Sequence, residues 1–210
     1  MDGILLVDKP QGWTSHDVVA YIRKKFKIKK VGHCGTLDPL ATGLLIVLLG
    51  KSTKTSKEFL PYEKTYSTVM KIGATTNTGD RQGNITQVFE DKKLEKKQIV
   101  QALQTFLGES FQVPPMVSAI KIRGRKLYEM ARKGIKVQRK PKLIKISKIE
   151  FIEYNHPYIS FNVRCSGGTY IRSLIEDIAK KINTGAHMTY LRRIRIGEFD
   201  VQDALPPTHI

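Results

Sequence analysis

The run of apolar residues from Leu44 to Leu49, which lies between Gly43 and Gly50, constrains the fold of this chain more than any other feature. A short, continuous apolar run bounded by glycines is typical of a β-strand that is buried on both faces. The run is the longest of its kind in the sequence. It is nevertheless far shorter than the roughly 20 apolar residues that a membrane-spanning helix needs. We therefore predict a buried strand within a globular protein, and we expect no membrane partner.

The rest of the chain mixes strand and helix patterns. Short apolar or alternating runs predict strands over residues 4–8, 66–72, 143–151, 159–165 and 194–199. Helical spacing predicts one helix after a cap at Thr14 or Ser15, and others over 94–107, 127–132 and 170–182. The stretch 32–43 has no period and predicts a loop. Because no regular βαβ order exists, we predict the α+β class, with a mixed, mainly antiparallel central sheet flanked by helices.

Basic residues exceed acidic ones, with 36 Lys+Arg against 19 Asp+Glu and a formal net charge of +17. The excess is concentrated at 23–30, at 121–148 and at Arg192, Arg193 and Arg195. Such clusters repel one another unless a polyanion neutralises them. They therefore favour a surface that binds the phosphates of nucleic acid. A solvated basic face, or attraction to an anionic membrane surface, would produce the same composition.

The cysteines and the N-terminus limit the classes of protein that this sequence fits. Cys34 and Cys165 are the two cysteines, and neither belongs to a Cys-x-x-Cys pair or to a Cys/His group at zinc spacing. A disulfide scaffold is therefore not expected, and we predict no metal. The N-terminus lacks the basic segment of a signal peptide, so we expect a cytoplasmic location. With no linker or internal repeat, we predict a single domain over 1–210.

The most informative stretch reads Gly32-His33-Cys34-Gly35-Thr36-Leu37-Asp38-Pro39-Leu40-Ala41-Thr42-Gly43. Pro39 disfavours helical geometry at the residue before it and so presents the Asp38 carboxylate on a stiff turn. The local sequence leaves two interpretations open, because Asp-Pro pairs are also ordinary turn formers. His33 is likewise as compatible with a packed or capping histidine as with a catalytic one.

This stretch resembles the active-site motif of the bacterial tRNA pseudouridine-55 synthases. Other stretches similar to that family occur in order along nearly the whole chain, from about residue 4 to residue 199. They are Asp8-Lys9-Pro10 with Thr14-Ser15-His16-Asp17, Lys64-Thr65-Tyr66, Thr76-x-Thr78-x-Asp80-x-x-Gly83, Gln112-x-Pro114-Pro115-x-x-Ser118-Ala119-x-Lys121, Tyr128-x-x-Ala131-Arg132-x-Gly134, Gly168-Thr169-Tyr170-Ile171-Arg172-Ser173-Leu174 and Gly185-Ala186-His187-Met188-x-x-Leu191-Arg192-Arg193. The resemblance implies a pseudouridine-synthase-like fold.

The resemblance also implies an enzyme that isomerises the T-loop uridine at tRNA position 55 to pseudouridine, without a metal or organic cofactor. It makes Asp38 the catalytic carboxylate. Asp38 would act either as a nucleophile, at the uracil ring or at C1′, or as a base that removes the C2′ proton. Either role needs an ionised carboxylate in a dry pocket, and desolvation opposes ionisation. The family places an arginine beside the carboxylate, at the position that matches Arg172.

Further residues match the family's contacts with a base that has been flipped out of the RNA. Tyr66 and Tyr170 match its base-contacting tyrosines, and stacking on them would recover part of the cost of unstacking. His33 matches the histidine that occupies the space left in the loop, and Leu191 matches an apolar wall of the pocket. The candidates for RNA-backbone contacts come from the basic clusters and are Lys24, Lys25, Arg125, Lys126, Arg192 and Arg193.

Three other motif residues are not expected to take part in the chemical step. Lys9 and Lys64 either support the site or contact phosphates. Asp80 either organises its Gly/Thr-rich loop or pairs with a nearby arginine.

Family members often continue into a small C-terminal RNA-binding module, for which a chain that stops at Ile210 has no room. We therefore expect the catalytic domain to hold the T arm of tRNA with its own basic clusters, as a monomer without an obligatory protein partner. The related guide-RNA-dependent synthases share the Asp loop, but they require that module. Two other functions stay open at this point: a non-catalytic RNA binder or tRNA-folding chaperone, and an RNA glycosidase that releases uracil.

Overall fold

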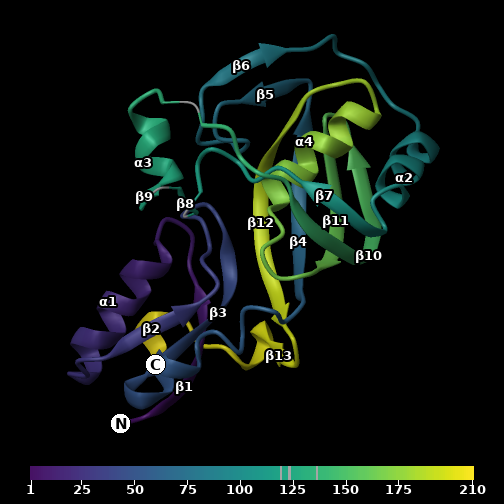
Figure 1. Cartoon of the computed structure of the whole chain (residues 1–210). Coiled ribbons are helices and arrows are strands. Elements are labelled where there is room, and N and C mark those ends of the chain that lie inside the picture. The colour runs from purple at the N-terminus through teal and green to yellow at the C-terminus, as the bar shows by residue number, and fades with distance from the viewer. Residues whose placement is uncertain (119, 123, 136) are drawn as a thin grey trace. The chain divides into compact units, whose positions relative to one another are not determined.

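Helices and strands follow one another irregularly along the chain in this computed structural model (Figure 1). The structure describes residues 1–118, 120–122, 124–135 and 137–210. Ala119, Arg123 and Lys136, which belong to stretches singled out in the sequence, lie outside the described residues. The side chains of Lys121, Ile122, Lys126 and Arg132 lie outside the described part as well.

The strands are β1 (Gly3–Lys9), β2 (Val31–Cys34), β3 (Thr42–Leu49), β4 (Lys64–Ile72), β5 (Ala74–Thr76), β6 (Ile85–Val88), β7 (Gly108–Gln112), β8 (Lys121–Ile122), β9 (Arg125–Lys126), β10 (Lys142–Asn155), β11 (Tyr158–Cys165), β12 (Ala186–Ile196) and β13 (Phe199–Asp200). The α-helices are α1 (Ser15–Phe26), α2 (Lys96–Gln104), α3 (Leu127–Arg132) and α4 (Ile171–Lys181). Three short 3-10 helices are η1 (Gly50–Thr55), η2 (Val201–Asp203) and η3 (Pro207–His209). This order confirms the predicted α+β class.

The chain forms two compact units, and neither is continuous in sequence. The first unit contains residues 1–68, 162–168 and 190–210, and the second contains 69–161 and 169–189. Strands β4, β11 and β12 each contribute residues to both units. The Asp38 turn therefore belongs to the first unit, and helix α4, which carries Arg172, belongs to the second.

Strand β3 is the centre of the first unit. It pairs with β1 in antiparallel register from Gly3↔Leu49 to Lys9↔Gly43. Its last four residues also pair with β2, so β1 and β2 must lie on opposite edges of β3. At the start of β3, Thr42 and Gly43 pair in parallel with Arg192 and Arg193 of β12. Parallel and antiparallel pairs meet on the same strand, which confirms the predicted mixed sheet.

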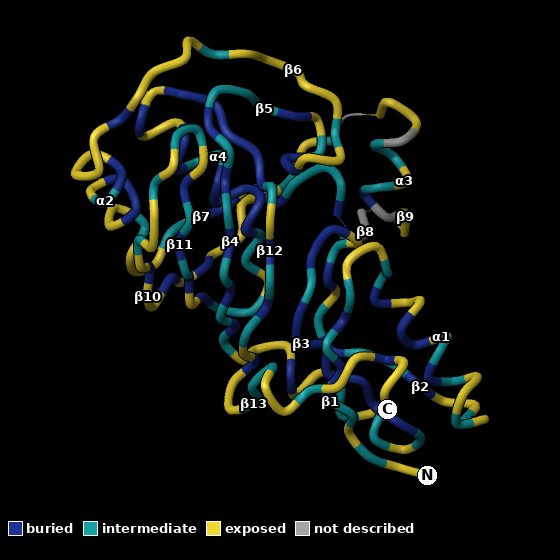
Figure 2. The backbone as a smooth tube through the Cα atoms, turned by 180° about the vertical axis from the view of Figure 1, so that it is seen from behind, coloured by how far each residue is buried: buried dark blue, intermediate teal, exposed yellow. Residues whose placement is uncertain are grey.

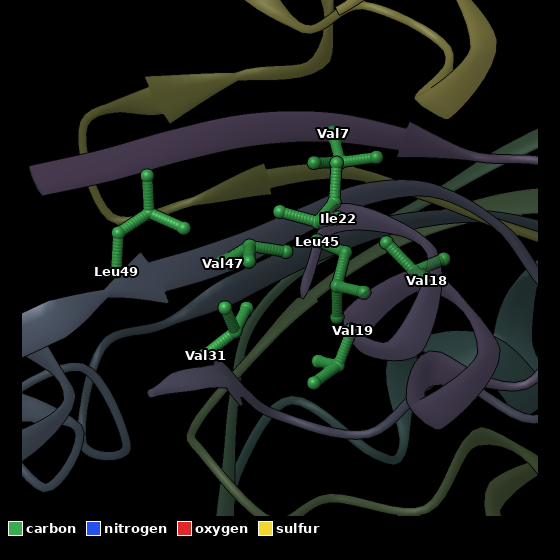
Figure 3. Packing of buried hydrophobic residues seen from close by; sticks show 8 residues of the cluster. All are labelled: Val7, Val18, Val19, Ile22, Val31, Leu45, Val47 and Leu49. Carbon is green, nitrogen blue, oxygen red and sulfur yellow. The ribbon is translucent and has the colours of Figure 1, made fainter. Parts of the chain in front are cut away.

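The two faces of β3 are both buried, as the apolar run predicts. Figure 3 shows Leu45, Val47 and Leu49 packed with residues of β1, β2 and α1. The residues of α1 in this cluster are Val18, Val19 and Ile22. On the other face, Leu44, Ile46 and Leu48 pack with Cys34, Phe59 and Ile196. Because burying each large aliphatic side chain contributes about 1.5–3 kcal/mol, this strand is a main source of stability in the first unit.

The second unit contains the antiparallel pair β7–β10 and helices α2 and α4. The pair runs from Lys142↔Gln112 to Ile146↔Gly108. Along β10 the buried residues are Ile144, Ile146 and Ile149, and α4 buries Leu174, Ile175 and Ile178. Strand β6 pairs with β5 and is exposed along its whole length, which Figure 2 shows clearly. Among the residues that the structure describes, no helix is long and apolar enough to span a membrane.

Two predicted boundaries are wrong in ways that matter for the site. The stretch 32–43, predicted as a loop, contains most of β2, and the strand predicted at 194–199 begins at Ala186 as β12. The side chains of His187 and Thr189 on β12 bond to the carbonyls of Ala74 (2.9 Å) and Val69 (3.2 Å). Because these bonds satisfy polar groups inside a sheet, hydrophobic periodicity does not reveal the strand. Helix α2 is also shorter than the predicted 94–107.

The start of α1 provides a test of the local fold. The Thr14 side chain accepts from the Asp17 backbone N–H (3.0 Å), and the Asp17 carboxylate accepts from that of Thr14 (2.7 Å), as the capping-box spacing predicts. Replacement T14A removes one of these bonds, so we expect a loss of about 0.5–2 kcal/mol in the free energy of unfolding. Urea denaturation measures this loss. Replacement T14S keeps the hydroxyl and serves as the control, and an equal loss in both variants would contradict the capping role.

Candidate active site

The Asp38 carboxylate lies on a short turn between two strands of the first unit. The backbone N–H of Ala41 donates to the carbonyl of Asp38 (3.0 Å) and closes the turn. Leu37, Leu40 and Ala41 are buried on either side, whereas Asp38 itself is half-buried. The turn is thus fixed by its apolar neighbours, while Asp38 keeps part of its surface exposed.

Three residues from two distant parts of the chain hold this turn in place. The hydroxyl of Ser15, the first residue of α1, accepts from the N–H of Leu37 (2.8 Å) and lies 3.2 Å from the carbonyl of the same residue. The N–H of Gly12 donates to the carbonyl of Pro39 (2.9 Å). Arg193 donates from Nη2 to the carbonyl of Gly35 (3.0 Å). With supports from α1, from the β1–α1 turn and from β12, the backbone around Asp38 has little freedom to move.

Arg193 connects several parts of this region through its side chain. Its side chain is buried, with only 1% of the residue exposed, and Nε donates to the carbonyl of Leu44 (2.7 Å). Its positive charge also lies near the Tyr66 phenol and opposes the rise in the pKa of that group. The prediction that Arg193 contacts the RNA backbone is therefore wrong, because its guanidinium binds interior carbonyls and is not on the surface. Arg193 instead links the Asp38 turn to strand β3 and lies near Tyr66.

The backbone of Arg193 also passes unusually close to Gly43. A Cβ atom added at Gly43 would lie 2.3 Å from the carbonyl oxygen of Arg193, and Gly43 has a φ of +99°. Both the contact and the backbone angle require glycine here. The close approach of β3 and β12 places the guanidinium beneath the turn.

Lys9 is a second buried cation near Asp38. Its Nζ donates to the carbonyls of Pro10 (2.9 Å) and Trp13 (2.6 Å), and the residue is fully buried. Burial lowers the pKa of Lys9 to about 8; the charge of Arg193 also lowers it, and that of Asp38 opposes the shift. An amine held by two interior carbonyls is not placed to contact a phosphate, so support for the site stays as the prediction for Lys9.

Tyr66 and His33 complete the group of site residues in the first unit. Burial raises the pKa of the Tyr66 phenol, and the nearby charge of Arg193 opposes that shift. Burial lowers the pKa of His33, and the positive charges of Arg193 and His16 lower it further. Both side chains are therefore held in their neutral forms near neutral pH. Neutral rings of this kind suit contacts with an uncharged base.

Two other motif residues of the first unit are engaged in internal contacts. Arg192 forms a two-pronged ion pair with Asp8, with N–O distances of 3.1 and 2.7 Å, and this hydrogen bonding raises the pKa of Arg192. The Nζ of Lys64 donates to the carbonyls of Phe59 (3.3 Å), Leu60 (2.7 Å) and Tyr62 (2.6 Å). Lys64 thus stabilises the turn before β4 and is not placed to contact a phosphate; its support of the site stays a prediction. Leu191 is buried on β12.

The remaining predicted site residues belong to the second unit. The side chain of Arg172 is buried and donates to the carbonyls of Thr78 (2.7 Å) and Val117 (2.8 Å). The Gln112 amide brackets the backbone of Tyr170, accepting from its N–H (2.8 Å) and donating to its carbonyl (3.1 Å). The roles of Arg172 and Tyr170 beside Asp38 stay predictions.

Asp80 and the basic residues Arg125 and Lys126 also belong to the second unit. The Asp80 carboxylate accepts from the Thr78 hydroxyl (2.7 Å) and the Gln82 N–H (3.0 Å), which confirms that it organises its loop. Arg125 is exposed. The side chain of Lys126 lies outside the described part. Within the described ranges, no three His, Cys, Asp or Glu side chains gather in a way that could hold a metal ion.

The sequence matches one family over most of its length. Residues 23–171 match the family described as TruB family pseudouridylate synthase, N-terminal domain. The chain belongs to the TruB family. Residues 172–207, which include α4 and β12, match the description tRNA pseudouridylate synthase B C-terminal domain.

Individual TruB relatives align with nearly the whole chain. The tRNA pseudouridine synthase B of Clostridium tetani is 46% identical over 205 residues, which are 98% of this chain and 71% of that protein. The Haemophilus influenzae protein (strain Rd) of the same name is 44% identical over 98% of this chain and 66% of its own length. That of Endomicrobium trichonymphae is 43% identical over 98% of this chain and 89% of its own length. The chain thus spans about two thirds of the first two relatives and most of the third.

Solved structures show the same fold. The chain described as a Cbf5-Nop10-Gar1 complex has a TM-score of 0.76 and 34% identity over 97% of this chain and 51% of its own length. A second, described as an H/ACA RNP bound to a substrate RNA containing 2′-deoxyuridine, has a TM-score of 0.69 and 33% identity over 94% of this chain. This chain spans 48% of that second structure. These likenesses confirm the predicted pseudouridine-synthase-like fold.

The support around the TruB motif is the part that sequence reasoning missed. Ser15 occurs in a motif and Gly12 lies shortly before it, but nothing in their spacing indicates that they bind residues 37 and 39. Arg193 was grouped with surface cations because it follows another arginine. A strand predicted over β12 would have placed Arg192 and Arg193 on opposite faces of the sheet, since neighbouring residues of a strand point to opposite faces.

The lowered pKa of Lys9 predicts a pH dependence of stability. The ordinary pKa of 10.5 is that of the unfolded chain, and the folded value is about 8, so the unfolded state binds the proton more tightly. The free energy of unfolding should therefore rise between pH 8 and 10.5, by up to about 3 kcal/mol from this residue. Urea denaturation of the native protein and of the K9M variant would show this rise as a difference curve.

Replacement K92M, at an exposed lysine outside the basic clusters, is the matched control, and its difference curve should lack the rise expected for K9M. Absence of the rise for K9M as well would show that Lys9 keeps an ordinary pKa in the folded state.

Proposed function

We propose that this chain converts the T-loop uridine at position 55 of tRNA into pseudouridine. In this isomerisation the C1′–N1 bond breaks, a C1′–C5 bond forms, and the proton on C5 is replaced by one on N1. The atoms of the uridine balance, so the reaction consumes no co-substrate. We also propose that it proceeds without a metal or organic cofactor.

The observation that carries this proposal is the fixed turn at Asp38. In a chain that belongs to the TruB family, the residue that matches the family's catalytic carboxylate stands half-exposed on a turn held by two distant parts of the chain. Such rigid presentation is what a reacting group needs, because small displacements from the productive geometry are costly. An ordinary Asp-Pro turn would not require support from two distant parts of the chain, the stretch 12–15 and β12.

The chemistry leaves two roles for the Asp38 carboxylate. It acts either as a nucleophile towards the uracil ring or C1′, or as a base that takes the C2′ proton to give a glycal-like intermediate. Both roles use the ionised carboxylate. The charges of Lys9 and Arg193 in the first unit lie near it, and the family's arginine at Arg172 would add a third.

Base binding follows from the neutral rings and the apolar wall. We propose that Tyr66 and Tyr170 stack on the flipped uracil, that His33 occupies the space left in the T loop, and that Leu191 lines the pocket. Stacking of this kind contributes about 1–3 kcal/mol per base, which offsets part of the few kcal/mol needed for flipping.

Exposed cations would bind the phosphate backbone of tRNA. Lys24, Lys25 and Arg125 are exposed, and Arg192 is half-buried through its pairing with Asp8. We propose these residues, with Lys126, as backbone contacts. We further propose that the protein acts as a monomer in the cytoplasm, without an obligatory protein partner.

Replacement D38N tests the catalytic assignment. Removing the charged carboxylate should reduce pseudouridine formation on an unmodified tRNA transcript by roughly 10³-fold or more. The Kd for tRNA should change only a few-fold, because phosphate contacts dominate affinity. Pseudouridine mapping and filter binding measure the two quantities.

Replacement D203N, at an exposed aspartate, should leave both quantities unchanged. Substantial turnover by D38N would contradict the assignment. Release of free uracil by the native protein would indicate a glycosidase, and tight binding without any product would indicate an RNA binder.

Replacement R193K tests the interior support. Lysine keeps the charge but cannot reach the Leu44 and Gly35 carbonyls together. We expect kcat to fall by about 10- to 100-fold through misplacement of the turn, with the Kd for tRNA nearly unchanged. Single-turnover kinetics and binding separate these effects. An increase in Kd with unchanged kcat would instead support the earlier expectation of a backbone contact.

A further inference from the structure

Seven exposed lysines gather at one end of the first unit. We name this group the lysine face; its members are Lys24, Lys25, Lys27, Lys29, Lys30, Lys51 and Lys54. They come from the last turn of α1, from the connection to β2 and from η1. Figure 2 shows exposed chain at this end of α1. The η1 lysines are not part of any cluster noticed in the sequence.

Backbone contacts prove that these segments are neighbours. The N–H of Gly50, which begins η1, donates to the carbonyl of Lys30 (2.8 Å). Val31, the next residue, pairs with Leu49 at the end of β3. The guanidinium of Arg23 donates to the carbonyl of Val31 (3.3 Å), which ties the end of α1 to the same point. The lysines before β2 and those of η1 therefore lie around one corner of the sheet.

The charge on this face is almost uncompensated. Among the ion pairs of the described residues, none includes a member of the lysine face. The nearby carboxylate of Asp2 is bound to the backbone N–H of Lys51 (2.8 Å). Like charges packed this closely repel one another, so a polyanion would relieve the repulsion.

The composition of the face favours phosphate over lipid or protein. None of the large apolar residues found exposed in the described chain comes from 23–30 or 50–57. Membrane-surface helices need an apolar face to insert, and protein interfaces need apolar anchors. A group of lysines whose own segments expose no large apolar side chain is suited to counterion release from a nucleic-acid backbone.

The lysine face is far from Asp38 within the same unit. The Asp38 turn leads into Thr42 at the start of β3, whereas Lys51 follows Leu49 at its end. A strand of eight residues extends over roughly 24 Å at about 3.4 Å per residue. That length corresponds to about seven phosphates along one strand of a duplex. A phosphate on the lysine face therefore cannot belong to the nucleotide that reaches Asp38.

We propose that the lysine face binds the phosphate backbone of tRNA several nucleotides away from the target uridine. This proposal rests on the proposed function, and it adds a second contact that a short T-loop hairpin cannot reach. The affinity of the protein then depends on RNA length, while the chemical step at Asp38 does not.

Replacement K51E/K54E tests the proposal, because η1 lies outside the core clusters and both side chains are exposed. The Kd for full-length tRNA should rise about 10-fold or more, and the slope of log K against log salt should fall by about two. The Kd and single-turnover rate on a stem-loop with a stem of about four base pairs should stay unchanged. The pair K29E/K30E, on the neighbouring connection, should behave in the same way.

The matched control is K92E/K93E, which makes the same charge change at exposed lysines of the second unit. It should have less than half the effect on full-length tRNA. Equal losses in the control and the K51E/K54E variant, equal losses on both RNAs, or no loss at all would overturn the lysine face. Absence of pseudouridine from the native protein would overturn the proposed function instead, since the lysine face is judged by ratios of Kd.

Discussion

The buried guanidinium of Arg193 is the interaction on which the rest of the site depends. It hydrogen-bonds to the Asp38 turn and to β3, and its charge lies near Tyr66, so features far apart in sequence share one cation. An uncompensated buried charge is costly, and hydrogen bonds to carbonyls offset that cost only while all of them are kept. Loss of any one of these hydrogen bonds is therefore expected to displace the groups that the others hold.

Lys9 is a second buried cation that backbone carbonyls stabilise, with an ammonium group in place of a guanidinium. Its ammonium group is held by two carbonyls at the end of β1, and burial shifts its pKa strongly. Two buried cations thus lie close to one carboxylate in the first unit. The excess positive charge of the chain accordingly serves two purposes: an internal part supports the turn, and an external part such as the lysine face is available to a polyanion.

Sequence patterns predicted the apolar core well and the polar interior poorly. The buried strand at Leu44–Leu49 and the capping box at Thr14 and Asp17 were predictable because local periodicity and spacing determine them. The Asp38 turn was identifiable by its resemblance to a family. The bonds that hold it, from Ser15 and Arg193, join residues that are 22 and 158 positions apart from their partners. No local pattern encodes such pairs, because they arise only once the sheet has formed.

The register of β12 determines which of its two neighbouring arginines, Arg192 or Arg193, points into the interior. Arg192 bonds to Asp8 with a partly exposed side chain, while its neighbour points into the interior. A slip of β12 by one residue would exchange these two positions and turn the supporting cation outwards. In the observed register Gly43 faces Arg193, and the missing side chain lets the two backbones approach closely at the residue whose guanidinium enters the interior. A side chain at position 43 would push β12 away from β3 and withdraw that cation from the site.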